Sequence, residues 1–177
     1  METMSHIDGY AAALLEIARA EGDVERVTDE IYRAAQAMEA NTELRETLAD
    51  PQIPAGRKLG IVEDLLGGRA SRATVAAVHL VVHAGRAREL AAVATRMAEL
   101  VAEQQGAIVA EVRSAVELDP AQVTRLEAAL SEATGRRVEA KVVVDPSVVG
   151  GVVTKIGDTV FDGTVKGRLD ELREQWA

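Results

Sequence analysis

Two histidines of this chain of 177 residues, His79 and His83, are spaced as two zinc ligands on one helical face would be. Neither an H-E-x-x-H sequence nor a third ligand lies nearby in the sequence, and the residues around the pair are apolar. The chain also has no cysteine, which excludes disulfides, thiolate metal sites and a cysteine nucleophile. We therefore expect no metal site, and we expect the two histidines to be structural or to face a partner.

Three aspartates gather near a paired glycine, Gly150-Gly151, toward the end of the chain: Asp145, Asp158 and Asp162. No Lys-Ser or Lys-Thr follows the glycines, which argues against a phosphate-binding loop. Turn formation and helix capping account for the aspartates, and a divalent-cation site built from them is the alternative. No serine has an evident histidine base, and the other acidic pairs suit solvated helix faces. We predict no catalytic residue and no cofactor.

The segment that contains these aspartates has the pattern of a hairpin followed by a helix. Val152–Ile156 and Thr159–Asp162 are short, β-branched runs, and Gly157-Asp158 separates them by the spacing of a tight turn. After them, a helical stripe of apolar residues runs to the end of the chain. Its members are Val165, Leu169, Leu172 and Trp176.

Composition narrows the class of protein further. Hydrophobic residues make up 47% of the chain, which allows a core without cross-links. The net charge is −9 and only 2% of the residues are aromatic, which argues against nucleic-acid binding. Residues 1–8 lack the features of a signal peptide, and the apolar run Val75–Val82 is far shorter than the about 20 residues that span a bilayer. These features predict a soluble protein.

The first part of the chain repeats a helical apolar period. Ser5–Asp8 resembles a capping box that would begin the first helix, and the prolines Pro51 and Pro54 interrupt the pattern later. Six helices with short connections are expected before Gly106. The predicted class is α+β: an N-terminal six-helix bundle over residues 1–105, followed by a small α/β domain with a β-hairpin over residues 106–177.

The fifth of these helices, expected over residues 71–84, has almost no polar side. A helix that is apolar all round is expected to be buried all round, which would make it the central helix of the bundle. The alternative is that one side packs inward while the other forms part of a groove for an amphipathic helix. The two interpretations are compatible.

After Gly106 the apolar period changes from helical to alternating. Residues 107–116 and 138–144 alternate as half-buried strands do. Between them, Asp119-Pro120-Ala121-Gln122 predicts a helix start, with a capping aspartate, proline at the first helical position and a glutamine that reaches back. Gly135 is expected to end that helix.

The chain resembles the ATP synthase delta subunit family, whose mitochondrial member is the oligomycin-sensitivity-conferring protein. The most specific match is the C-terminal signature, in which the one departure is Thr164 where the family has serine. The matching residues are Tyr10-Ala11-Ala12-Ala13-Leu14, Pro51, Lys58, Gly85-Arg86, Leu90, Glu111–Ala115, Asp145, Gly150-Gly151, Val152-Val153, Ile156-Gly157-Asp158, Val160 and Asp162–Val165. They occur in the family's order over the whole chain.

The resemblance implies a non-catalytic stator subunit of the F-type proton-translocating ATP synthase. In the family the helical domain binds the N-terminal helix of an alpha subunit in a groove of its first and fifth helices, and the α/β domain meets the C-terminal end of b-type stalk helices. Such a subunit would be a peripheral membrane protein at the cytoplasmic face of the cell membrane. It would be attached there only through the other subunits of the ATP synthase. The expected groove residues are Tyr10, Ala13, Leu14, Ile17, Val75, Val78, His79, Leu80 and Val82. The expected stalk-binding residues are Val165, Leu169, Leu172 and Trp176.

Two other hypotheses stay open at this point. A different helical adaptor would share the groove but would have no need of the signature hairpin. A small enzyme would use the Gly-Gly loop and the neighbouring aspartates, and it would bind a nucleotide or a divalent metal ion.

Overall fold

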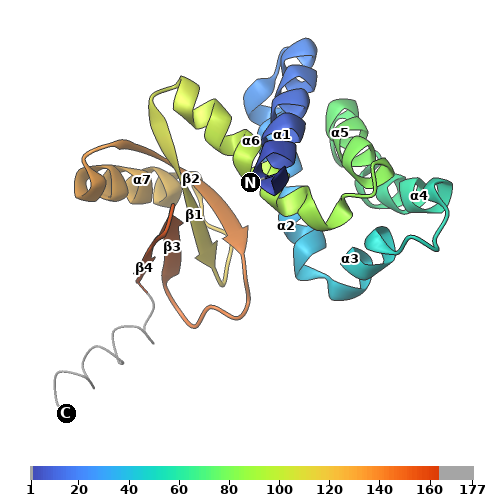
Figure 1. Ribbon diagram of the computed structural model, residues 1–177. Coiled ribbons are helices and arrows are strands. Elements are labelled where there is room, and N and C mark those ends of the chain that lie inside the picture. The colour runs from blue at the N-terminus through green and yellow to red at the C-terminus, as the bar shows by residue number, and fades with distance from the viewer. Residues whose placement is uncertain (1, 164–177) are drawn as a thin grey trace. The chain divides into compact units, whose positions relative to one another are not determined.

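The computed structural model describes residues 2–163 of the chain (Figure 1). Over these residues it contains seven α-helices, one short 3-10 helix and a four-stranded sheet, so the fold is of the mixed α+β class. The elements are α1 (Glu2–Glu21), α2 (Val24–Ala40), α3 (Thr42–Ala49), α4 (Ala55–Leu66), α5 (Arg72–His83), η1 (Ala87–Glu89), α6 (Leu90–Gln104), β1 (Ala107–Ser114), α7 (Pro120–Thr134), β2 (Arg137–Val144), β3 (Val152–Ile156) and β4 (Thr159–Asp162). The chain divides into two compact units, Met1–Val101 and Ala102–Ala177.

Several helices of the first unit are preceded by a residue whose side chain caps the helix start. The carboxylate of Asp23 accepts from the Arg26 backbone N–H, and the side chain of Asn41 accepts from the Leu44 N–H. Each satisfies one of the backbone donors that a helix start leaves without an intrahelical partner. The predicted capping box at Ser5–Asp8 is wrong, because α1 already begins at Glu2 and these residues lie inside it. Residues 2–4 include no helix-breaking glycine or proline, so the helix begins upstream of the predicted start.

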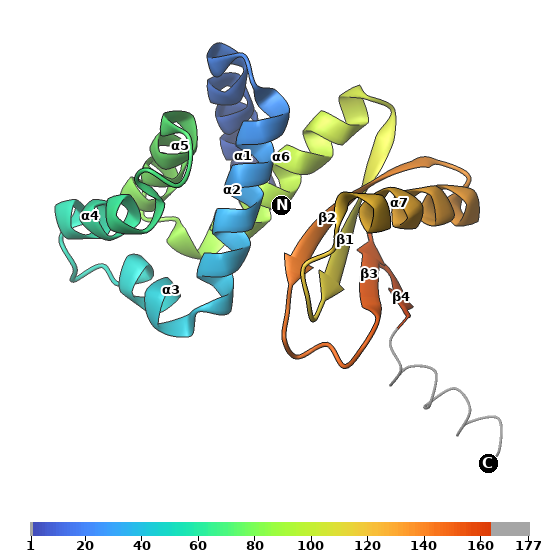
Figure 2. The ribbon, with the colours of Figure 1, turned by 180° about the vertical axis from the view of Figure 1, so that it is seen from behind.

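Helix α5 packs against α1, α2 and α4, and Figures 1 and 2 show it between α1 and α4. Its inward stripe is fully buried, and residues from the other helices complete the core. The largest fully buried side chains of this unit are Leu14, Val27, Ile31, Tyr32, Leu48, Val62, Val78, Val81, Val82, Val93 and Met97. The expectation that α5 is buried all round is wrong, since Leu80 is 41% exposed and Ala76 is also exposed. Helix α5 is therefore central on one side and open to solvent on the other.

The second unit is a sheet with strand order β2-β1-β3-β4. Strands β1 and β2 are parallel and are joined through α7, whereas β3 is antiparallel to β1 and forms the predicted hairpin with β4. A parallel pair needs such a crossover helix, and α7 covers one face of the sheet (Figures 1 and 2). The core between them consists of Ala110, Val112, Leu130 and Val138, with Ile108, Leu118, Leu126, Ala140, Val142, Val152 and Ile156 packed around it.

In the second unit, glycines mark the end of α7 and the turn of the hairpin. Gly135 ends α7 with φ +66°, and Gly157 forms the hairpin turn with φ +56°, both in the left-handed region that favours glycine. Strand β1 ends at Ser114, so the alternating run predicted over residues 107–116 is two residues longer than the strand. Val116 is 65% exposed and lies beyond the strand.

The capping box of α7 is present as the sequence predicts. The carboxylate of Asp119 accepts from the Gln122 N–H at 2.7 Å, and the Gln122 side chain accepts from the Asp119 N–H at 2.8 Å. Pro120 occupies the first turn, where its missing N–H costs nothing.

We expect Asp119→Ala to destabilise the start of α7 by about 1 kcal/mol, because the backbone N–H of Gln122 loses its acceptor. Hydrogen exchange of the full chain should show faster exchange of the amides in the first turn of α7. Glu132→Ala, on an exposed position of the same helix, is the control and should leave those amides unchanged. Equal exchange rates in wild type and Asp119→Ala would contradict the assignment of the cap.

Candidate partner-binding surface

The nine residues that the sequence assigns to a groove divide into three groups by burial. Leu14, Val78 and Val82 are buried, with exposed fractions of 0 to 2%, so their side chains belong to the core of the helical unit. Tyr10, Ile17, Val75 and His79 are half-buried, and Ala13 and Leu80 are exposed. A partner can contact only the half-buried and the exposed residues. The buried residues would contribute indirectly, by holding the backbones of α1 and α5 in place.

His79 lies on the side of α5 that faces α4. Its Nε2 is 3.1 Å from the backbone oxygen of Leu59, and because a carbonyl only accepts, Nε2–H is the donor. Val75 is one helical turn earlier, on the same side of α5. The contact makes His79 a link between α4 and α5. His83 is exposed.

Five accessible apolar residues of α1 and α5, Tyr10, Ala13, Ile17, Ala76 and Leu80, define what we call the α1–α5 surface. Tyr10, Ala13 and Ile17 recur at helical spacing along one side of α1. Ala76 and Leu80 are one turn apart on α5, and both are exposed. Because α1 and α5 pack directly against each other, these five residues lie on neighbouring helices.

Arg86 lies over Tyr10, at one end of this surface. Its guanidinium carbon is 5.7 Å from the centre of the Tyr10 ring, a cation–π distance. One terminal nitrogen donates to His6 Nδ1 at 2.9 Å, and the other donates to both carboxylate oxygens of Glu89 at 2.9 and 3.0 Å. Arg86 thus fixes the first half of α1 against the turn between α5 and α6.

Glu30 of α2 positions α5 from its N-terminal end. Its Oε2 accepts from the Ser71 N–H and from the Thr74 hydroxyl, each at 2.7 Å, and its Oε1 accepts from Arg26 at 2.9 Å. Ser71 is the N-cap of α5, so a carboxylate lies at the positive end of that helix. Burial alone would raise the pKa of Glu30, but the hydrogen bonds from Ser71, Thr74 and Arg26 outweigh it and lower the pKa to about 2.

The sequence analysis missed Glu30, because its partners lie 41 and 44 residues away along the chain. No local pattern distinguishes it from the other acidic residues of α2. Only the packing of α2 against α5 brings the carboxylate to the helix start.

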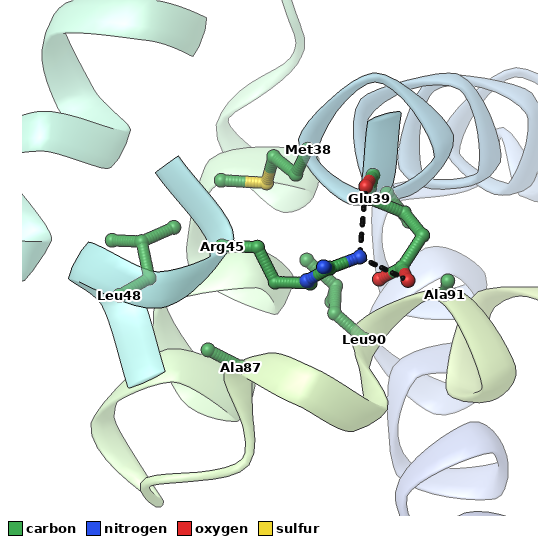
Figure 3. A pocket seen from close by; sticks show the side chains of 8 residues that line it. Met38, Glu39, Arg45, Leu48, Ala87, Leu90 and Ala91 are labelled. Carbon is green, nitrogen blue, oxygen red and sulfur yellow. Dashed lines mark hydrogen bonds and ion pairs between the residues drawn. The ribbon is translucent and has the colours of Figure 1, made fainter. Parts of the chain in front are cut away.

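A small hollow of the helical unit lies elsewhere, between α2, α3 and the start of α6 (Figure 3). Figure 3 shows Arg45 reaching across it to Glu39, with bonds of 2.8 Å to the carboxylate and 3.2 Å to the backbone oxygen. The other lining residues are apolar, and the cavity volume of about 10 Å³ is at the lower limit for one water molecule. The hollow is a packing gap closed by an ion pair, too small for a cofactor.

Asp145, the first aspartate of the C-terminal signature, stabilises a turn through its carboxylate. Asp145 Oδ1 accepts from the backbone N–H of Ser147 at 2.9 Å and from its hydroxyl at 2.6 Å. These bonds, the hydroxyl first, lower the pKa of Asp145. Within residues 2–163 no three His, Asp or Glu side chains are grouped so that they could hold a metal ion. The predicted stalk-binding residues, Val165, Leu169, Leu172 and Trp176, lie outside the described residues.

An apolar surface over two packed helices, joined in sequence to a small α/β unit, is typical of a protein that docks other proteins. Comparison with known proteins defines the class further. The chain matches the family described as "ATP synthase delta (OSCP) subunit" over residues 7–176. It belongs to that family, whose members are structural and not catalytic subunits of the ATP synthase and form part of its peripheral stalk.

Individual relatives agree with this assignment. The chain is 35% identical to ATP synthase subunit delta of Chlorobaculum tepidum over 93% of its own length and 91% of the relative. It is 42% identical to ATP synthase subunit delta of a Nocardioides species over 99% of its own length and 62% of that longer relative. A chain in the structure of the Toxoplasma gondii mitochondrial ATP synthase hexamer has the same fold, with a TM-score of 0.57, 21% identity and 96% of each chain covered.

Membership of this family removes the small-enzyme hypothesis, because the delta subunit performs no catalysis. The subunit serves an assembly that couples ion transport to ATP synthesis. Among the described residues, no helix is both long and apolar enough to cross a bilayer.

Proposed function

We propose that this chain is a stator link, which holds the catalytic alpha/beta head of the ATP synthase to its peripheral stalk. Torque from the central shaft would otherwise turn the head together with the shaft. A link that resists this needs firm attachment at both ends, and it forms and breaks no covalent bond. In this proposal the six helices act as one bundle, residues 1–105 serve the head, and residues 106–177 serve the stalk.

The α1–α5 surface is the observation that carries the head-side part of the proposal. It presents Tyr10, Ala13, Ile17, Ala76 and Leu80, which are apolar and accessible, on two helices in direct contact. Small alanines allow a third helix to approach closely, and the larger side chains supply area for burial. We propose that the surface binds the N-terminal helix of an alpha subunit through the apolar face of that helix.

On the stalk side we propose the C-terminal end of a b-type subunit as the partner of the α/β unit. Val165, Leu169, Leu172 and Trp176 remain the sequence-based candidates for that contact. Attachment at two sites of one assembly makes the second contact effectively intramolecular, which slows dissociation far beyond either contact alone. Through these contacts the chain would lie at the cytoplasmic face of the cell membrane as a peripheral component.

A binding measurement with an alpha-subunit peptide tests the head-side proposal. We expect the full chain to bind a peptide of the alpha-subunit N-terminus from the same organism with a Kd of about 1 μM or below, as an amphipathic helix on a two-helix surface can. A peptide of the same composition in scrambled order, which cannot form an apolar face, is the control. Equal binding of both peptides, or of neither, would refute the head-side proposal.

A further inference from the structure

Helix α4, which follows a short loop after α3, begins without a side-chain cap (Figure 1). The residue before it is Pro54, whose ring has no acceptor, whereas α2, α3, α5 and α7 are each capped by a side chain. The N–H groups of Arg57 and Lys58 donate to the Pro54 oxygen at 3.0 and 3.3 Å. Ala55 and Gly56 are exposed, and no described residue accepts from their N–H groups. Two backbone donors are therefore free at this helix end.

Lys58 is a buried lysine beside these donors. Its side chain is only 6% exposed, and no described residue forms a hydrogen bond or an ion pair with its ammonium group. A buried lysine stem is ordinary when the charged group reaches either a partner or water. The ammonium is not among the polar atoms that the fold encloses completely, so it reaches solvent. Lys58 thus presents a positive charge that its own chain does not pair.

The ammonium of Lys58 emerges at the start of α4. Ala55, Lys58 and Val62 share one side of the helix, at spacings of three and four residues. Val62, one turn after Lys58, is fully buried, whereas Ala55, one turn before it, is exposed. Helical side chains lean toward the N-terminus of their helix and cover the preceding turn. The open route for the ammonium therefore leads over Ala55 to the helix end with the free N–H groups.

The other charges at this helix end also favour an anion. The N-terminus of a helix carries about half a positive charge. Arg57 in the same turn is exposed, and within residues 2–163 its guanidinium has no partner. The nearest acidic residue upstream, Asp50, accepts from the Gln52 N–H at 2.8 Å and forms no ion pair with a described cation. The acidic residues of α4 itself lie in its second half. The first turn is therefore a concentration of positive charge and free donors.

We propose that the start of α4 binds a phosphate group. The N–H groups of Ala55 and Gly56 donate to its oxygens. Lys58 and Arg57 supply the opposite charge, and two cations at a helix N-terminus suit a doubly charged oxyanion. Donors on three separate groups suit the several oxygens of a phosphate better than the two of a carboxylate. Inorganic phosphate and the terminal phosphate of a nucleotide both present this chemistry. The site uses no residue of the α1–α5 surface and is independent of the stator function.

A titration of the full chain with sodium phosphate, at neutral pH and constant ionic strength, tests the site by amide NMR. We expect the signals of Ala55 and Gly56 to shift and to saturate with a Kd of about 1 mM, as a small ligand at an open site can. The start of α5, which already holds the Glu30 carboxylate, is the internal control and should not shift. A second titration with ATP identifies the source. A Kd at least about 10-fold lower than that of phosphate assigns the site to a nucleotide, and an equal Kd assigns it to free phosphate.

Two variants remove the proposed donors separately. Lys58→Met removes the ammonium and keeps an apolar stem, which a buried position tolerates. Ala55→Pro removes one N–H at the first helical position, where proline fits, and Pro54, with φ −56° and ψ 139°, has the backbone that a following proline requires. We expect each variant to bind phosphate about 10-fold more weakly, with unchanged affinity for the alpha-subunit peptide. Arg72→Met, which removes an exposed cation at the capped start of α5, is the matched control and should bind phosphate as wild type does.

Each contrary result overturns the proposal. Shifts that do not saturate, or an equal Kd for acetate and phosphate, would mean general attraction of anions. Wild-type binding by both variants would place the phosphate elsewhere. Weaker binding by Lys58→Met but not by Ala55→Pro would exclude the helix end. If thermal unfolding shows that Lys58→Met has lost its fold, Ala55→Pro decides, because it leaves the buried side chains unchanged. None of these results bears on the stator function, which the alpha-subunit peptide tests separately.

Discussion

Leu80→Asp is expected to weaken binding of the alpha-subunit N-terminal peptide by about 100-fold or more while the chain stays folded. Removing a leucine from an interface costs about 1.5–3 kcal/mol, and a carboxylate buried there without a partner adds to the loss. In the free protein Leu80 is 41% exposed, so the substitution costs the fold little. Isothermal calorimetry measures the affinity, and circular dichroism with thermal unfolding checks the fold.

Leu65→Asp is a closely matched control for this variant. Leu65 is 39% exposed and lies in the last turn of α4, as Leu80 lies in the last turn of α5. Both variants therefore place a new negative charge near the negative end of a helix, at a similar small cost in stability. We expect Leu65→Asp to keep full affinity for the peptide. Equal losses in both variants, or an unfolded Leu80→Asp chain, would show that the α1–α5 surface is not the binding site.

Glu30→Ala is expected to destabilise the helical unit by about 2–3 kcal/mol. The carboxylate accepts three hydrogen bonds, and its side chain is only 11% exposed, so its loss leaves the donors at the start of α5 without their partner. Because α5 forms one half of the α1–α5 surface, affinity for the alpha peptide should fall as well. Urea unfolding of the full chain, followed by circular dichroism, measures the stability, with Glu63→Ala at an exposed position of α4 as the control.

The pH dependence of stability separates the charge of Glu30 from its size. Since folding lowers the pKa of Glu30 from 4.5 to about 2, its contribution is complete above pH 4.5 and is lost as the pH falls toward 2. Wild type should therefore be more stable than Glu30→Gln at pH 7, and the difference should shrink at pH 3. A difference that stays constant between these pH values would mean that the ionised carboxylate does not stabilise the start of α5.

Local patterns predicted much of the second unit correctly. The capping box at Asp119, the hairpin turn at Gly157-Asp158 and the helix end at Gly135 are all present, because each depends on neighbouring residues. The same local rules failed at Ser5–Asp8, where a cap-like pattern lies inside α1. A capping box is effective only if the helix begins there, and the residues upstream are helical.

For the candidate site, the sequence identified the helices but could not sort their residues. Val78 and Leu80 are both apolar residues of one uniformly apolar helix, yet one is fully buried and the other is 41% exposed. A helix without a polar side has no internal signal for which face turns inward. The arrangement of α1, α2 and α4 around α5 decides this.

The sequence by itself determined the family, the mixed fold class and the positions of most helices and strands, since these depend on residue order over short distances. Only the tertiary structure decided which apolar residues stay accessible and which distant groups meet. Glu30 reaches the start of α5, His79 reaches the Leu59 carbonyl, and Arg86 lies over Tyr10, because packed helices bring together residues from 20 to 76 positions apart. Such contacts depend on three-dimensional packing, for which a local pattern carries no signal.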